Sequence, residues 1–183
     1  MSQLPEHPVD ATLTNLGQRW LLALERTLTS APQDVWAALT DKALVARWAP
    51  FDPDHDLTET GPVALPEAGI QRSGDDAADA ANNVGRIVTV APQRMLSLVW
   101  GGDPLDIELA PTASATVVRL SHTFDDRANA ASYAAGWHLC LAALEGVAAG
   151  LDVPRMVGDA AKLHGWDELH ERYGELFGDR AAT

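Results

Sequence analysis

The sequence predicts an α+β domain in which one long helix near the C-terminus lies across a curved antiparallel sheet. Three observations lead to this class. Residues 129–150 repeat apolar side chains at helical spacing. Residues 56–124 consist of short segments separated by turn residues, as in antiparallel strands. Two short helical segments separate these strands from a first strand at 19–29.

The long helix organises the rest of the chain. Asn129 is suited to its N-cap, and Gly150 stands where a left-handed residue would end it. Gly136 in its middle costs about 1 kcal/mol relative to alanine. The sequence leaves three explanations for Gly136 open: a second backbone close by, a ligand, or a tolerated glycine. The apolar face that the sheet must cover comprises Tyr133, Trp137, Cys140, Leu141, Leu144 and Ala148.

The first strand alternates apolar and polar side chains over residues 19–29, and Arg26 falls on the apolar side. Arg26 either packs its stem and reaches an acidic partner at the rim, or lines a pocket as a cation. Pro32 then favours the first turn of a short helix that carries Trp36 inward, and a second short helix ends before Pro50. The helix pair has few basic residues, which argues against a DNA reader.

Six further strands are expected, near residues 56–60, 62–65, 84–90, 94–100, 105–109 and 114–124. In the last of them His122 shares a side with apolar residues, either as a satisfied core histidine or as a polar anchor for a ligand. Residues 66–83 are acidic and lack periodicity, so they are expected to form a loop that gates a cavity or a disordered insertion.

Three parts are predicted: an N-terminal arm at 1–18, the α+β domain at 19–150, and a helical extension at 151–183. The extension has helical patterns near 155–163 and 166–177, and the second carries an aromatic face. A helix this short needs a partner surface, so we expect it to pack on the domain or on a second subunit, which makes a homodimer plausible.

Composition excludes several functions. The 26 acidic residues outnumber the 13 basic ones, giving a formal net charge of −13, which argues against nucleic acid and anionic membrane as partners. Cys140 is the lone cysteine and is expected to be an inert core thiol. No phosphate loop or metal-spaced cluster is present, so no cofactor and no metal are expected. Without a signal peptide or membrane span in the sequence, the expected location is cytoplasmic.

Three segments of the chain together resemble one known family. They are Arg26-Thr27-Leu28 with Ala31-Pro32, Val35-Trp36, residues 38–41 and Trp48; Gly85-Arg86-Ile87 with Pro92, Met95-Leu96 and Trp100; and Gly136-Trp137 with Leu141 and Leu144. This pattern, over roughly residues 19–150, is similar to the SRPBCC (START-like, Bet v 1-like) superfamily, in the branch named for the C-terminal domain of the activator of Hsp90 ATPase. The resemblance implies a helix-grip fold, in which the sheet grips the long helix around an apolar cavity.

The resemblance and the aromatic content together predict binding of an apolar or aromatic small molecule between helix and sheet. An enzyme of the cyclase, aromatase or hydrolase kind, with His122 or Tyr133 as acid or base, is the alternative. A third alternative is a protein that interacts with Hsp90 as a co-chaperone. The residues expected to line the cavity are Trp36, Trp48, Phe51, Arg86, Trp100, His122, Tyr133, Trp137 and Leu141.

Overall fold

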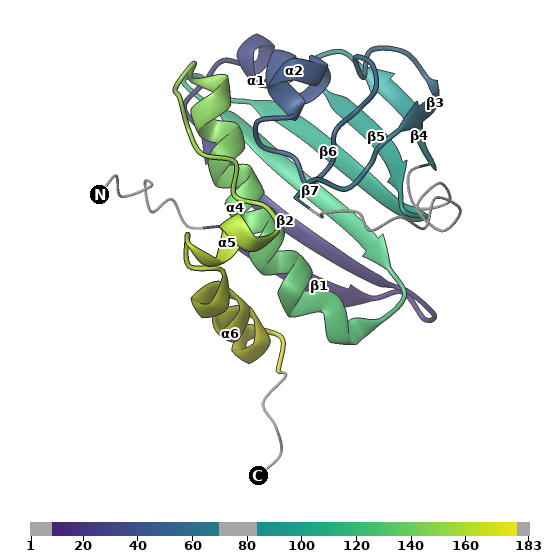
Figure 1. Ribbon diagram of the computed structural model, residues 1–183, viewed down its shortest axis with the longest axis vertical. Coiled ribbons are helices and arrows are strands. Elements are labelled where there is room, and N and C mark those ends of the chain that lie inside the picture. The colour runs from purple at the N-terminus through teal and green to yellow at the C-terminus, as the bar shows by residue number, and fades with distance from the viewer. Residues whose placement is uncertain (1–8, 70–83, 179–183) are drawn as a thin grey trace.

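The computed structural model describes residues 9–69 and 84–178, and it confirms the α+β class. A curved antiparallel sheet carries the long helix α4 across one face (Figure 1). The strands are β1 (Asp10–Asn15), β2 (Trp20–Leu28), β3 (Gly61–Ala64), β4 (Val84–Ala91), β5 (Met95–Trp100), β6 (Asp103–Pro111) and β7 (Thr116–Phe124). The helices are α1 (Pro32–Thr40), α2 (Lys42–Val45), the 3-10 turn η1 (Arg127–Asn129), α4 (Ala130–Ala148), α5 (Asp159–Lys162) and α6 (Trp166–Leu176).

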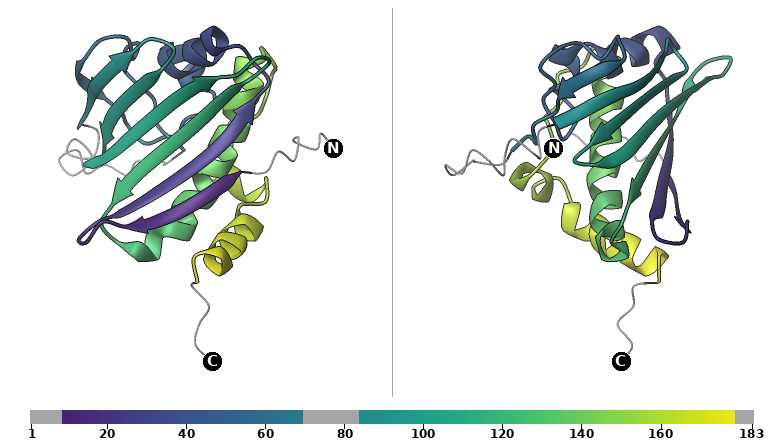
Figure 2. Two further views of the ribbon diagram at one scale, coloured as in Figure 1. Left: turned by 180° about the vertical axis from the view of Figure 1, so that it is seen from behind. Right: turned by 90° about the vertical axis from the view of Figure 1, so that its right-hand side faces the viewer.

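The seven strands follow the order β1-β2-β7-β6-β5-β4-β3, with every neighbouring pair antiparallel. Strands β2 and β7, far apart in the sequence, therefore lie side by side, with Leu22 opposite His122 and Leu24 opposite Leu120. Because side chains alternate along a strand, one face of this pair is directed at α4. The sheet curves around that face, and α1 and α2 lie at one end of it (Figure 2).

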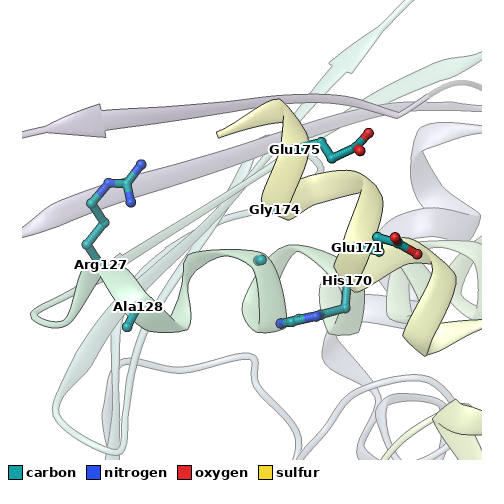
Figure 3. A pocket seen from close by; sticks show the side chains of 7 residues that line it. Arg127, Ala128, His170, Glu171, Gly174 and Glu175 are labelled. Carbon is teal, nitrogen blue, oxygen red and sulfur yellow. The ribbon is translucent and has the colours of Figure 1, made fainter. Parts of the chain in front are cut away.

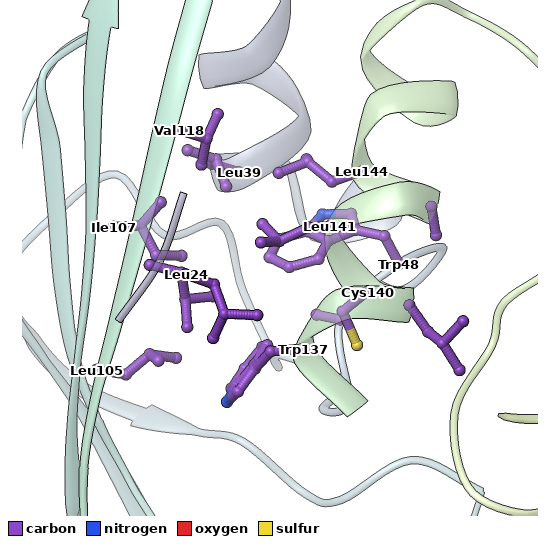
Figure 4. Close-up of a cluster of buried hydrophobic side chains, with 14 of the residues drawn as sticks. Leu24, Leu39, Trp48, Leu105, Ile107, Val118, Trp137, Cys140, Leu141 and Leu144 are labelled. Carbon is purple, nitrogen blue, oxygen red and sulfur yellow. The ribbon is translucent and has the colours of Figure 1, made fainter. Parts of the chain in front are cut away.

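Helix α4 is the centre of the core. Fourteen of its 19 residues are buried, because the sheet covers one side and the C-terminal extension covers part of another. Leu141 and Leu144 are fully buried and lie close to Trp48 and Leu39 (Figure 4). Burial of each such side chain contributes roughly 1.5–3 kcal/mol, so this contact fixes α4 against α1 and the segment that follows α2.

An ion pair joins α4 to β2 inside this core. Arg26 donates from Nε and Nη2 to Oε2 of Glu145, at 3.0 and 2.7 Å. Only 2% of Arg26 and 7% of Glu145 are exposed. Arg26 was expected either to pack its stem and reach an acidic partner at the rim or to line a pocket. It has the acidic partner, Glu145, but this partner is buried in the interior and not at the rim.

The extension packs along α4. Helix α6 places Tyr173 against it, and the hydroxyl of Tyr173 lies 2.9 Å from Nδ1 of His138. Nearer the end of α4, a Cβ at Gly146 would overlap the side chain of Val153, so the glycine permits a close approach of the extended segment that follows the helix. The extension was expected to pack either on its own domain or on a second subunit, and in the structure it packs on its own domain.

Three local predictions need correction. Residues 56–60 form no strand, because their backbone is held by other contacts: the amide of Leu57 donates to the carbonyl oxygen of Thr40, and the carboxylate of Asp56 accepts from the amide of Lys42. The helix expected near 155–163 is limited to α5, since Gly158 before it has a positive φ of 56°.

The third correction concerns the predicted arm, whose residues Asp10–Asn15 form the edge strand β1. Ala11 and Leu13 are half-buried on one side of that strand. The acidic stretch expected as a loop lies largely outside the described residues, as does the first part of the arm. Among the described helices, none combines the length and apolar character needed to cross a bilayer.

Candidate functional site

A pocket of about 560 Å³ opens beside the middle of α4, on the side covered by the extension. This volume is in the range of small-molecule sites. Its wall combines α4 with the end of β5, the turn after β3, and the segment that contains α5 (α4, β5 and α5 are labelled in Figure 1). The lining residues are Pro50, Glu67, Gly69, Trp100, Ser132, Tyr133, Gly136, Trp137, Cys140, Met156, Val157, Gly158, Asp159, Ala161, Lys162 and Trp166.

Three of the expected site residues meet in this pocket: Trp100, Tyr133 and Trp137. The Trp100 and Trp137 rings are 6.2 Å apart in an edge-to-face arrangement, which is a favourable geometry for aromatic pairs. Trp100 also donates from Nε1 to the carbonyl oxygen of Leu65, at 3.1 Å. One wall of the pocket is therefore a fixed aromatic surface.

The other expected lining residues lie elsewhere. Leu141 and Trp48 are fully buried core residues, and the indole nitrogen of Trp48 donates to the carbonyl oxygen of Ala38 at 2.8 Å. Phe51 is buried behind the aromatic wall, with its ring 5.2 Å from that of Trp100.

Two further members of the set are placed outside the wall. Trp36 is half-buried on α1. Arg86 is exposed on β4, on the opposite side from the buried Ile87, so its guanidinium is on the outer face of the sheet.

His122 lies directly behind the aromatic wall and not in it. The indole Nε1–H of Trp137 donates to Nδ1 of His122, at 3.1 Å. Since an indole N–H can only donate, Nδ1 must be the acceptor, and the ring proton is on Nε2. Nε2 then donates to Oδ2 of Asp103, also at 3.1 Å. Both ring nitrogens are thereby engaged within the protein.

This hydrogen-bonded chain continues to the surface. Arg19 donates from Nη2 to Oδ1 of Asp103 and from Nε to Oδ1 of Asp125, each at 2.6 Å. Burial lowers the pKa of His122, although the hydrogen bond that His122 donates to Asp103 and the negative charge of Asp103 act in the opposite direction. The neutral ring is thus the form that holds Trp137, and His122 acts as a positioning residue for the pocket wall.

Tyr133 is the polar member of the aromatic wall. Its ring packs against His122 at 4.6 Å and against Phe124 at 5.0 Å between centroids. Partial burial raises the pKa of its hydroxyl, and the carboxylates of Asp103, Glu67 and Asp126 raise it further. The phenol is neutral near pH 7 and can both donate and accept a hydrogen bond in the pocket.

Gly136 faces the pocket from α4. A Cβ built at this position meets no heavy atom within 4 Å, so the close backbone approach is excluded as its explanation. Two of the three explanations for Gly136 therefore remain: a ligand close to the helix, or a glycine that is simply tolerated. The glycine keeps open the space between Trp137 and the extension, because any larger side chain here would project into it.

The extension forms a large part of the pocket wall, and this contribution was not predicted from the sequence. Met156 and Ala161 are buried, and Trp166 lies half-buried with its ring stacked on His170 at 4.8 Å. Trp166 begins the aromatic row of the last helix, which was the one available signal in the sequence. Cys140 also lines the pocket, but burial raises the pKa of its thiol to about 12, as expected for an unreactive cysteine.

A second hollow lies between the start of α4 and α6 (Figure 3). Arg127 on its edge donates from Nη2 to the carbonyl oxygen of Phe177 at 2.6 Å, and its guanidinium lies 5.4 Å from the centre of the Trp20 ring. These contacts tie the extension to the domain. Within residues 9–69 and 84–178, no group of three His, Cys, Asp or Glu side chains is placed to hold a metal ion.

A long helix held against a curved antiparallel sheet, with two short helices at one end, defines a helix-grip protein. The family model described as "Activator of Hsp90 ATPase homolog 1-like protein" matches residues 29–149, and the chain belongs to this family. The resemblance drawn from the sequence motifs is thereby confirmed.

Solved structures give the same fold. The solution structure of CalU16 from Micromonospora echinospora has a TM-score of 0.69 at 20% identity, covering 96% of this chain and 98% of that one. A conserved protein of unknown function from Enterococcus faecalis gives 0.69 at 16%, covering 94% and 92%. The AHSA1-like protein from Aeromonas hydrophila gives 0.55 at 22%, covering 72% and 95%. At these identities the likeness shows the fold alone, and no curated protein matches the sequence.

Proposed function

We propose that the protein binds an apolar or aromatic small molecule in the pocket beside α4. The observation that best supports this proposal is the open space at Gly136, which is bounded by the rings of Trp100 and Trp137 and by the extension. Preformed pockets with aromatic walls and a few polar groups are the usual sites for such ligands. Tyr133 supplies a polar group that orients the guest.

The catalytic alternative receives less support. A general acid or base must exchange a proton with the substrate, yet the two ring nitrogens of His122 are engaged by Trp137 and Asp103. Tyr133 faces the pocket, but its raised pKa makes it a poor base near neutral pH. The interaction with Hsp90 rests on the family description and not on a feature of the site.

The test is to fill the pocket. Gly136→Leu is expected to keep the fold, because its Cβ meets no atom, and to abolish binding by occupying the guest's volume. Gly136→Ala adds a single methyl group and should retain weakened binding. Ala149→Leu places the same side chain at an exposed site on the end of the same helix, outside the pocket, and serves as the control.

The measurement is ligand-induced stabilisation across aromatic amines, alcohols, fatty acids and polyketide-like aromatics. A ligand at 100 times its Kd stabilises the native state by about 2.7 kcal/mol, which raises Tm by roughly 5–11 °C for a chain of this size. We expect hits with the wild type and Ala149→Leu that disappear with Gly136→Leu. Hits that persist unchanged in Gly136→Leu would place binding elsewhere and refute the proposal.

A further inference from the structure

The charged groups around the pocket indicate what kind of ligand it takes. This inference rests on the function proposed above, because it concerns the same pocket. Among the described residues that line the pocket, Glu67 and Asp159 are two carboxylates on the rim, and Lys162 is the cation. The rim therefore has an excess of negative charge next to an aromatic wall.

The carboxylate of Glu67 is available to a ligand. No hydrogen bond or ion pair to it occurs within the described residues, whereas the carboxylate of Asp52, whose amide donates to the carbonyl oxygen of the adjacent Pro66, is paired with Arg155 at 2.8 Å. Partial burial raises the pKa of Glu67, since desolvation disfavours its charge. A cation bound beside Glu67 would offset the cost of desolvating its carboxylate.

The negative field extends into the pocket. The hydroxyl of Tyr133 experiences the charges of Asp103, Glu67 and Asp126, all of the same sign. Aromatic faces add to this field, because the π-system of tryptophan or tyrosine attracts a cation within about 6 Å of its centre. The lining contains four such rings, those of Trp100, Tyr133, Trp137 and Trp166.

We propose that the ligand is an organic cation: an apolar body that fills the space at Gly136, carrying an ammonium group that lies against the tryptophan and tyrosine rings near Glu67. The net charge of −13 assists the approach of such a ligand and opposes that of a carboxylate. Lys162 lies on the same rim and weakens the cation's binding, so its removal is expected to strengthen it.

The test compares, by calorimetry at low salt, three probes that share a naphthylmethyl body. They are naphthylmethyl trimethylammonium, its neutral analogue with a tert-butyl group in place of the trimethylammonium, and naphthylacetate. We expect the cation to bind about tenfold more tightly than the neutral analogue, and naphthylacetate to bind most weakly.

Three variants locate the charge effect. Glu67→Gln should weaken the cation about threefold to tenfold and leave the neutral analogue unchanged, whereas Lys162→Gln should strengthen the cation. Glu59→Gln, an exposed carboxylate outside the pocket, changes the net charge equally and should have little effect. This control separates local contact from the overall field.

The possible failures are distinct. If the neutral analogue or naphthylacetate binds as tightly as the ammonium, and Gly136→Leu abolishes that binding, the preference for a cation is refuted while the apolar pocket stands. If none of the three probes binds the wild type at millimolar concentration, the cation proposal is refuted, and the wider library then decides the proposed function separately. Equal losses in Glu67→Gln and Glu59→Gln would also overturn the assignment of Glu67.

Discussion

The ion pair between Arg26 and Glu145 offers a stringent test of how the core is held together. Two guanidinium nitrogens of Arg26 share one carboxylate oxygen at 3.0 and 2.7 Å, and both residues are more than nine-tenths buried. Glu145→Gln keeps the shape but removes the negative charge that faces the buried guanidinium. Loss of one charge from a buried pair costs about 3–5 kcal/mol, out of the 5–15 kcal/mol that holds a typical domain folded.

For a chain of this size, that loss lowers Tm by roughly 6–20 °C. Urea and thermal unfolding followed by circular dichroism would measure it. The double variant Arg26→Met with Glu145→Leu removes both charges and should recover most of the stability, because it leaves no charge to desolvate. A single variant that loses less than about 1 kcal/mol, or a double variant as unstable as the single one, would refute the reasoning.

Three further predictions concern α4. Gly136→Ala should raise Tm by roughly 2–4 °C, because alanine favours the helix by about 1 kcal/mol and its Cβ meets no atom; an unchanged Tm would contradict this. Burial lowers the pKa of His138 to about 4, so its contribution is present above pH 6.5 and is lost as the pH falls toward 4. The free energies of unfolding measured by urea titration at pH 7.5 and pH 5 should differ by about 1–2 kcal/mol, and by less in His138→Gln. Gly146→Val should destabilise the protein by overlapping Val153, which faster proteolysis of the extension would detect, whereas equal cleavage rates would argue against that contact.

Much of the fold could be predicted because its signals are local. The helical repeat around Trp137 and the alternation around His122 each lie within one element, and both residues face the interior as expected. The strand expected at 56–60 was wrong for the opposite reason: Asp56 and Leu57 take their hydrogen bonds from the distant start of α2 and end of α1. A short alternating segment cannot reveal such competing partners.

The candidate site was predicted only in its α4 and β5 parts. Trp100, Tyr133 and Trp137 were recognisable as inward aromatic residues, but their position in the pocket depends on the segment that covers them. That segment is anchored through Arg155, which donates to the carbonyl oxygens of Ala49 and Phe51. These are side-chain contacts to backbone atoms about a hundred residues away, and no periodic pattern in the sequence encodes them.

Only one partner of the ion pair between Arg26 and Glu145 was recognised from the sequence. Each is a charged residue in an otherwise apolar stripe, and a buried charge requires an opposite one. The inward direction of Arg26 was predicted from the alternation of its strand, whereas no role was predicted for Glu145, whose burial opposite Arg26 required the structure.

The family match ends at residue 149, whereas Met156, Ala161 and Trp166 in the wall beside α4 come after it. The part of the chain that makes the scaffold and the part that forms one side of the proposed ligand pocket are thus separate in the sequence. If the proposed function holds, substitutions in this segment are expected to alter ligand selectivity while the sheet and the gripped helix keep their packing. The selectivity of the proposed pocket therefore depends in part on a short segment that lies beyond the family match.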